Sequence, residues 1–299
     1  MINITSWAEL DVIRNNLTAD YQLMNNLSSS STGYIGIGDS FVPIGYYEEV
    51  EGEDIDTPFD GTFNGNGHTI SDLIIEQEIS KVGLFGVTGE NSSISNIGLI
   101  NANISGINNV GGLVGYNLST ISNSYTTGIV SGSGSNIGGL IGNHIDNANS
   151  NVYNSYSTVT VSGNTYVGGL VGSCTSNVYN SYSTGTVTGN SHVGGFAGYA
   201  SEGERLNCGW FYNPGYASVA IGNTIPIELI SYNIKVGGGV GYIDDTVDWF
   251  YDKTRDIYDT GVEPYWDFIT PIWYEHATDY PNFESGRRTT SPLPMFFRS

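Results

Sequence analysis

A Gly-rich hexapeptide recurs along this chain at nearly constant intervals. "VGGLVG" occupies residues 110–115 and returns letter for letter at 167–172, with near copies "IGGLIG" at 137–142 and "VGGFAG" at 193–198 and the shorter "VGLFG" at 82–86. The last glycine of each copy defines one column of the repeat: Gly86, Gly115, Gly142, Gly172 and Gly198. Such an internal period constrains the fold strongly, because it predicts one supersecondary unit that is copied and stacked.

An asparagine column runs in phase with these glycines. Three of its members open the related segments "NSYTTGIVSG", "NSYSTVTVSG" and "NSYSTGTVTG", and the whole column is Asn96, Asn123, Asn154, Asn180 and Asn207. Two columns that share one drifting period indicate a structural unit of about 27 residues. A repeated corner asparagine can link its side-chain amide to the next copy and satisfy carbonyls that a bend leaves unpaired.

The unit itself predicts the fold class. Each copy holds two short runs of β-forming residues separated by turn residues, and no helical periodicity lies between them. This pattern favours an all-β chain folded as a single-stranded parallel β-helix, a solenoid in which each unit is one coil. We expect the paired glycines to allow close backbone approach, and we expect one apolar column inside the coils: Leu113, Leu140, Leu170 and Phe196.

Both ends of the coil stack are predicted to be capped, because open ends expose apolar core and unpaired strand edges. Ser6 and Glu9 have capping-box spacing, and they accompany an apolar helical stripe formed by Trp7, Leu10, Ile13 and Leu17. The expected domains are a short capping helix at 1–19, the β-helix at 20–213, and an aromatic, acidic capping or binding region at 214–299.

The C-terminal region allows two interpretations. Its crowded aromatic residues form either a lid over the last coil or a surface that binds a glycan or a protein, since aromatic platforms beside carboxylates suit sugar rings and interface hot spots. If the region binds a ligand, the candidate residues are Trp249, Tyr251, Trp266, Trp273 and Tyr274. No metal site is predicted; weak candidates for a cation, which match no calcium-loop spacing, are Asp244, Asp245 and Asp248.

The charge of the chain excludes several classes of function. The formal net charge of −21 argues against nucleic acid and against an anionic membrane surface as partners. No apolar run is long enough to span a membrane. Residues 91–200 contain a single acid, Asp146, and no Lys or Arg, so catalysis by paired carboxylates on the lateral face is not expected. The acidic insertion at 46–58 is expected to be a solvated loop.

Two further features argue against a catalytic function. Cys174 and Cys208 fall in different columns of the repeat, so we expect two free thiols rather than a disulfide. The serine residues lack a GxSxG motif, and none of the four histidines stands in a HExxH motif. We therefore predict that the protein is not an enzyme and has no cofactor.

These residues resemble the GLUG-repeat proteins, a family named for its Gly-Leu-hydrophobic-Gly motif, which occurs in bacterial surface adhesins and in some immunoglobulin-A-cleaving metallopeptidases. The likeness includes "SWAELDVIRNNLTADYQLMNNLS" at 6–28, "FDGTFNGNGHTISDLII" at 59–75 and "YWDFITPIWYEHATDYPNF" at 265–283. It implies a right-handed parallel β-helix. It implies little about function, because such coils serve as scaffolds in several contexts.

The expected function is that of a non-enzymatic structural or attachment protein exposed on a surface. The start "MINITSWAELD" lacks the basic and apolar parts of a secretory signal, which favours a virion protein, such as a bacteriophage fibre, spike or capsid decoration, if Met1 is the true start. The alternatives are a bacterial cell-surface adhesin module and a polysaccharide-active β-helix enzyme. The expected partners are other virion or cell-surface proteins, a host glycan or receptor, and further copies of the chain, at a virion surface or an extracellular location.

Overall fold

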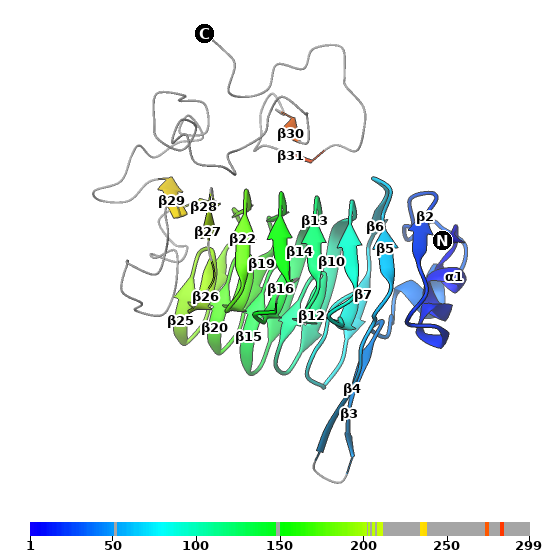
Figure 1. Ribbon diagram of the computed structural model, residues 1–299, viewed down its shortest axis with the longest axis horizontal. Helices are drawn as coiled ribbons and strands as arrows, with labels where there is room; N and C mark the ends of the chain where they lie inside the picture. The colour runs from blue at the N-terminus through cyan, green and yellow to red at the C-terminus, as the bar shows by residue number, and fades with distance from the viewer. Residues whose placement is uncertain are drawn as a thin grey trace.

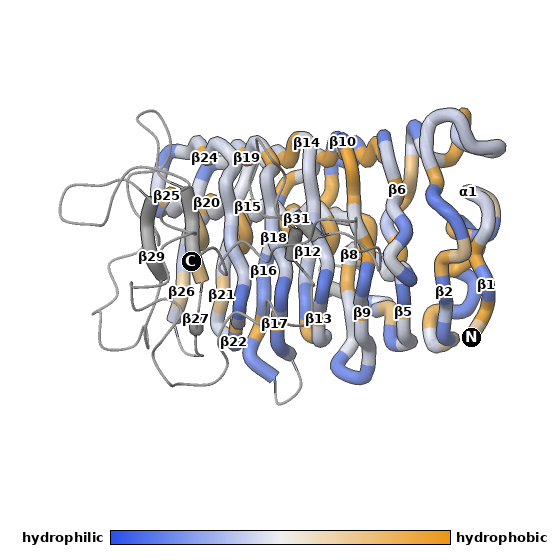
Figure 2. Tube along the Cα trace, turned by 90° about the horizontal axis from the view of Figure 1, so that it is seen from above, coloured by the Kyte–Doolittle hydropathy of each residue, from blue (hydrophilic) through white to orange (hydrophobic). Residues whose placement is uncertain are grey.

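The computed structural model describes residues 1–50, 53–147 and 150–201, followed by 203, 205–206, 208–211, 234–237, 273–274 and 282–283. Short strands lie side by side in a stack that starts beside an N-terminal helix, and the chain advances along the stack coil by coil (Figure 1). Seen from above, hydrophilic and hydrophobic residues alternate along successive coils (Figure 2). The fold is the all-β parallel solenoid that the repeat predicts.

Four parallel sheets form the walls of the described coils. The eight-stranded sheet contains, in order, β1 (Ile2–Ile4), β2 (Tyr21–Leu23), β5 (Thr62–Asn64), β9 (Ser93–Ser95), β13 (Thr120–Ser122), β17 (Asn151–Tyr153), β22 (Asn177–Tyr179) and β27 (Arg205–Leu206). The ten-stranded sheet contains β6 (Thr69–Ser71), β7 (Ile74–Glu76), β10 (Gly98–Gly106), β14 (Tyr125–Gly132), β18 (Tyr156–Ser157), β19 (Thr160–Ser162), β23 (Tyr182–Ser183), β24 (Val187–Thr188), β28 (Cys208–Phe211) and β29 (Ile234–Gly237).

The hexapeptides supply strands to the two smaller parallel sheets, one on each side of their central Gly-Leu or Gly-Phe pair. The four-stranded sheet contains β11 (Val110–Gly111), β15 (Ser135–Gly138), β20 (Thr165–Gly168) and β25 (Ser191–Gly194). The five-stranded sheet contains β8 (Phe85–Val87), β12 (Val114–Asn117), β16 (Ile141–His144), β21 (Val171–Cys174) and β26 (Ala197–Ala200). Each hexapeptide therefore bends the chain from one wall of the coil to the next.

Like residues stack inside the coils. The side chains of Leu113, Leu140, Leu170 and Phe196 are fully buried, and the backbone N–H groups of the three leucines each donate to the next member of this column at 2.9 Å. The eight-stranded sheet has its own buried column of residues in register: Phe63, Ile94, Ile121, Val152 and Val178. Because each of these side chains is covered by neighbouring coils, one coil is stable only against the next.

Backbone contacts between coils require the hexapeptide glycines. A Cβ atom on Gly142 would lie 2.5 Å from the carbonyl carbon of Asn109 in the preceding coil, and one on Gly198 would lie 2.2 Å from that of Tyr166. Both facing residues have positive φ, 52° and 55°, and so form a left-handed corner. The equivalent glycines, Gly115 and Gly172, meet the preceding coil at 2.5 and 2.4 Å. A side chain has no room in this column.

The asparagine column forms a ladder of side-chain amides. Starting from Asn64, the Nδ2 atom of each asparagine donates to the Oδ1 atom of the one in the preceding coil at 3.0–3.1 Å. The donors have φ between 47° and 56°, a left-handed conformation that asparagine tolerates well, and they are Asn96, Asn123, Asn154 and Asn180. Asn207 lies outside the described residues.

A helix covers the first coil, as predicted. In α1 (Trp7–Asp11) the Ser6 side chain caps the helix by accepting from the Glu9 backbone N–H at 3.3 Å. A 3-10 helix, η1 (Val12–Asn15), continues it, and a short helical turn, η2 (Tyr34–Gly38), packs beside it. The stripe is fully buried at Trp7, Leu10 and Ile13 and partly buried at Leu17.

The acidic insertion at 46–58 is not the loop that its composition suggests. It forms an antiparallel hairpin of β3 (Tyr46–Val50) and β4 (Glu53–Thr57), which projects from the coils (Figure 1). Besides its acids, the segment contains Tyr, Val, Ile and Thr, which are residue types that favour strands. At the hairpin base, Lys81 Nζ donates to both carboxylate oxygens of Asp56 at 2.7 and 2.8 Å and lies 5.0 Å from the centre of the Tyr116 ring.

Only short parts of the predicted C-terminal cap are described. Strand β29 pairs in parallel with β28, and β30 (Trp273–Tyr274) pairs antiparallel with β31 (Asn282–Phe283). The rest of 214–299 and the predicted boundary at residue 213 lie outside the described residues. The division into domains and the aromatic cap remain predictions.

Candidate binding groove

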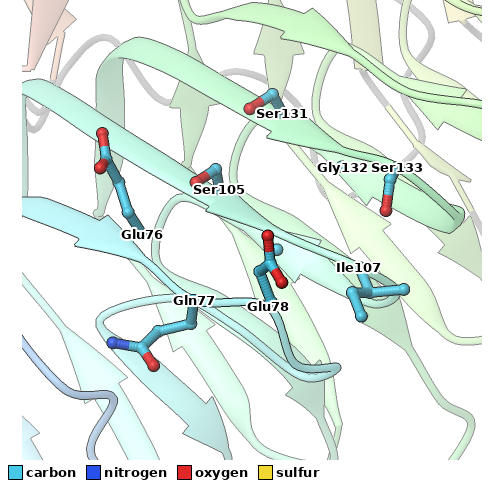
Figure 3. A pocket seen from close by; sticks show the side chains of 9 residues that line it. Glu76, Gln77, Glu78, Ser105, Ile107, Ser131, Gly132 and Ser133 are labelled. Atoms are coloured by element: carbon cyan, nitrogen blue, oxygen red, sulfur yellow. The ribbon is translucent and has the colours of Figure 1, made fainter.

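A groove crosses the lateral wall where three neighbouring strands, β7, β10 and β14, end. Its volume of about 780 Å³ lies within the range of small-ligand sites. The residues that line it come from three consecutive coils (Figure 3): Glu76, Gln77, Glu78, Ser105, Gly106, Ile107, Ser131, Gly132 and Ser133. Because these strands lie side by side, the groove spans three coils of the solenoid.

Strand register fixes the polar groups of this groove. Glu76 pairs with Ser105, and Ser105 pairs with Ser131, so one carboxylate and two hydroxyls form a single outward column (Figure 3). The residue before each of them is fully buried or nearly so: Ile75, Ile104 and Val130. The alternation of a strand therefore anchors the inward side chains in the core and presents the polar ones to the groove.

Most polar side chains of the groove have no partner within the part of the chain that the structure describes. Glu76 Oε1 accepts from Asn103 Nδ2 at 3.2 Å. Among the described residues, no hydrogen bond joins the side chains of Gln77, Glu78, Ser105, Ser131 and Ser133 to another protein group. The inward serines differ, since Ser124, Ser155 and Ser181 each donate to a backbone carbonyl at 2.7–2.8 Å.

The sequence did not predict this groove. The single acid in residues 91–200 argued only against catalysis on the lateral face, and the carboxylates of Glu76 and Glu78 lie in the coil just before that window. The available signal was the alignment of "IIEQE" at 74–78 with "NISGI" at 103–107 and "IVSGS" at 129–133. That alignment places Glu76 in the serine column.

A second set of reactive residues lies inside the coils. Asn117, His144 and Cys174 occupy one column in register, and all three are fully buried. His144 Nδ1 lies 3.0 Å from Asn117 Nδ2, and burial lowers the pKa of His144 to about 4. The imidazole is therefore neutral at pH 7 and enclosed by protein, which is typical of a core residue rather than of a catalytic base.

The two cysteines are also core residues. Cys174 and Cys208 are both free and fully buried, as predicted from their different columns. Burial raises the pKa of the Cys208 thiol, so the reactive thiolate is disfavoured. Among the described residues, no group of three or more His, Cys, Asp or Glu side chains is arranged to hold a metal ion.

Of the C-terminal binding candidates, the structure describes two. Trp273 and Tyr274 form strand β30. The other predicted binding residues and the weak cation candidates lie outside the described residues: Trp249, Tyr251, Trp266, Asp244, Asp245 and Asp248. Within the described part of the chain, no helix combines the length and the apolar character needed to cross a bilayer.

Three comparisons relate this chain to known proteins. Residues 163–188 match the family model of the GLUG motif. Over 145 residues the chain is 37% identical to Halomucin of Haloquadratum walsbyi, an alignment that covers 46% of this chain and 2% of Halomucin. A crystal structure assigned as an immunoglobulin A1 protease from Bacteroides ovatus superposes with a TM-score of 0.55 at 23% identity, over 70% of this chain and 66% of that chain.

These likenesses differ in what they show. The Bacteroides ovatus structure shows the fold alone at that identity, and the chain covers just under two thirds of its length. The chain covers a very small part of Halomucin. Together with the repeated coils, the motif match supports a β-helix repeat protein. The chain is a parallel β-helix protein that carries the GLUG motif.

Proposed function

We propose that this chain is a non-enzymatic structural or attachment module exposed on a surface. The observation that carries the proposal is the lateral wall itself. The described residues between 91 and 200 form parallel coils in register, and this stretch of the sequence contains no Lys or Arg and one acid, Asp146. A rigid, nearly uncharged wall of this kind suits a spacer or an adhesive surface, and the 37% identity to a segment of Halomucin supports a surface setting.

The reactive groups of the described coils favour binding over catalysis. His144 and Cys174 are enclosed in the core, where no substrate can reach them. Glu76 and Glu78 lie in a groove on the outer wall. Catalytic carboxylates act best in sites that exclude water, where their charges are worth more than in a solvated groove.

Two surfaces are candidates for the location of the protein. The sequence predicts a virion surface, and its alternative is a cell surface. The likeness to Halomucin favours a cell-surface or extracellular setting. We propose the same function, a surface module, for both locations, and the virion surface is one of the two.

Labelling of native material tests this proposal. An antibody raised against the full chain is applied to intact cells of the source organism and to purified virus particles from its cultures, and gold labelling is counted by electron microscopy. Label on unpermeabilised cells or on particles is the expected result. Label that appears only after the cells are permeabilised would refute a surface role.

An activity assay separates the module from the enzyme alternative. The full chain is incubated with a panel of polysaccharides, and reducing ends and unsaturated products are measured over time. We expect neither product to rise above the level of a heat-denatured control. A steady release that is lost in Glu76→Gln would instead support the polysaccharide-active alternative.

A further inference from the structure

We propose that the groove at Glu76, Ser105 and Ser131 binds one chain of a neutral, hydroxyl-rich glycan that lies along the axis of the solenoid. This inference deepens the proposed attachment function and rests on it. It differs from the sequence-based expectation, which placed any binding at the C-terminal aromatic residues.

The hydroxyl column continues beyond the groove. Ser131 pairs with Ser162, and Ser162 pairs with Thr188, so the column Glu76, Ser105, Ser131, Ser162 and Thr188 follows five consecutive strands. Neighbouring parallel strands lie about 4.8 Å apart. The wall therefore offers one polar group per strand. The spacing between strands is comparable with the length of one sugar unit in an extended chain. A repeating surface of this kind fits a repeating ligand.

The core holds this column rigid. The inward neighbours Ile104, Val130 and Val161 are buried at 0–1% exposure. The glycine that follows each serine packs directly on the core, since a Cβ on Gly132 would lie 2.1 Å from Ile137 Cδ1 and one on Gly163 would lie 2.7 Å from Ile137 Cγ1. Because the hydroxyls stand on a fixed backbone, binding would cost little ordering of the protein.

The unpartnered polar groups match the chemistry of a sugar. The hydroxyls of Ser105, Ser131 and Ser133 can both donate and accept, and the carboxylate of Glu78 accepts only. Sugar hydroxyls also donate and accept, so they complement both kinds of group. Ile107 adds an apolar surface on the groove wall, as sugar rings require on their C–H faces.

The charge of the site excludes acidic glycans. Glu76 and Glu78 would repel uronate or sulfate groups, and the coils from residue 91 to 200 supply no Lys or Arg to offset them. Lys81, the basic residue nearest to the groove in sequence, is held by both carboxylate oxygens of Asp56. A neutral glycan avoids this repulsion.

Binding of defined polysaccharides tests the proposal. Affinity electrophoresis and isothermal titration calorimetry are run on the full chain with neutral mannan, dextran and laminarin and with anionic polygalacturonate and dextran sulfate. We expect binding to at least one of the neutral polymers and to neither anionic one. Ser131→Tyr fills the groove and is expected to weaken binding at least tenfold, as is removal of an acceptor in Glu78→Ala.

The matched control is Ser122→Tyr, which lies on another wall of the same coil. Ser122 pairs with Tyr153, whose ring stacks on Tyr179 with centroids 5.2 Å apart, so a tyrosine there would extend an existing stack. This variant is expected to bind like the natural chain. Circular dichroism establishes that each variant is folded, and Glu78→Ala carries the test if Ser131→Tyr is not.

The outcomes separate this inference from the proposed function. Neutral glycan binding that survives both groove variants would move the site elsewhere and leave the attachment role intact. Binding only to the anionic polymers, or to none of the five, would overturn the glycan assignment, whatever surface the antibody labels. If the antibody labels no surface but glycan binding still depends on the groove, the proposed surface location is wrong and the glycan site stands.

Discussion

At the residue scale, two columns hold neighbouring coils together by different means. The hexapeptide glycines remove side chains where backbones meet, and the asparagines add side chains that donate to the preceding coil. The glycines face residues in the left-handed conformation, and the asparagines adopt that conformation themselves. Tyr166 and His192 have positive φ at positions where earlier coils have Asn109 and Asn136, so the corner tolerates other residues while its facing glycine does not.

The glycine contact makes a direct prediction about stability. In Gly172→Ala the new methyl group would lie 2.4 Å from the carbonyl carbon of Asn136, so the coils must separate or shift. Overpacking of this kind costs about 2–3 kcal/mol, and thermal or urea unfolding measures it. The control is Ser173→Ala at the adjacent, half-buried position, with an expected change below about 0.5 kcal/mol. Equal effects of the two substitutions would contradict the packing role of the glycine.

Buried His144 predicts a pH dependence of stability. Burial lowers its pKa from 6.5 to about 4 in the folded state, so between these values the unfolded chain binds a proton that the folded chain does not. Stability therefore falls as the pH drops from 6.5 towards 4, by about 3 kcal/mol in total. His144→Asn places there the residue found at position 117 of the same column and removes this term. Urea unfolding of both proteins across this pH range should show a smaller loss of unfolding free energy for the variant. If the two proteins lose stability in parallel as the pH falls, His144 is not the cause of the pH dependence.

At the scale of elements, the repeat predicted the strands of the coils, but it did not predict the hairpin or the groove. The coil strands follow from a pattern that recurs, since any error of register would displace a whole column such as Leu113, Leu140 and Leu170 from the core. The hairpin β3–β4 has no repeat to support it, and its many acids indicated a solvated loop. The groove was missed because it depends on register between coils, which places Glu76 beside Ser105.

The hairpin is predicted to detach without loss of the coils. Lys81 has a φ of 63°, and its side chain is the described link from the coil to Asp56. Lys81→Asn removes this link. It also places at the corner the residue type found at the equivalent corner of the next coil, Asn109, so the two asparagines can extend the amide ladder. Hydrogen exchange should become faster at 46–57 and stay unchanged in β12. Faster exchange in both segments would show instead that Lys81 supports the coil itself.

At the scale of the whole molecule, the repeat makes coils interchangeable, and this predicts the outcome of removing one. Residues 151–176 form one complete coil, because each strand in it pairs with the strand 26 residues later, from Asn151 with Asn177 to Cys174 with Ala200. Deletion of 151–176 would bring like residues into the vacated places, including Asn180 above Asn123 in the amide ladder. We expect a folded, shorter β-helix with cooperative unfolding.

Deletion of only 151–163 is the contrasting case, because it removes half a coil and places unlike residues over the core. This shorter deletion should lose the folded state, as judged by circular dichroism and gel filtration, although it removes fewer residues. The full-coil deletion also keeps the groove residues 76–133 but removes Ser162 from the hydroxyl column. If the glycan lies along that column, the shortened protein should bind the neutral polymer more weakly than the natural chain and more strongly than Ser131→Tyr. A folded half-coil deletion would contradict the stacking of interchangeable units on which the proposed groove depends.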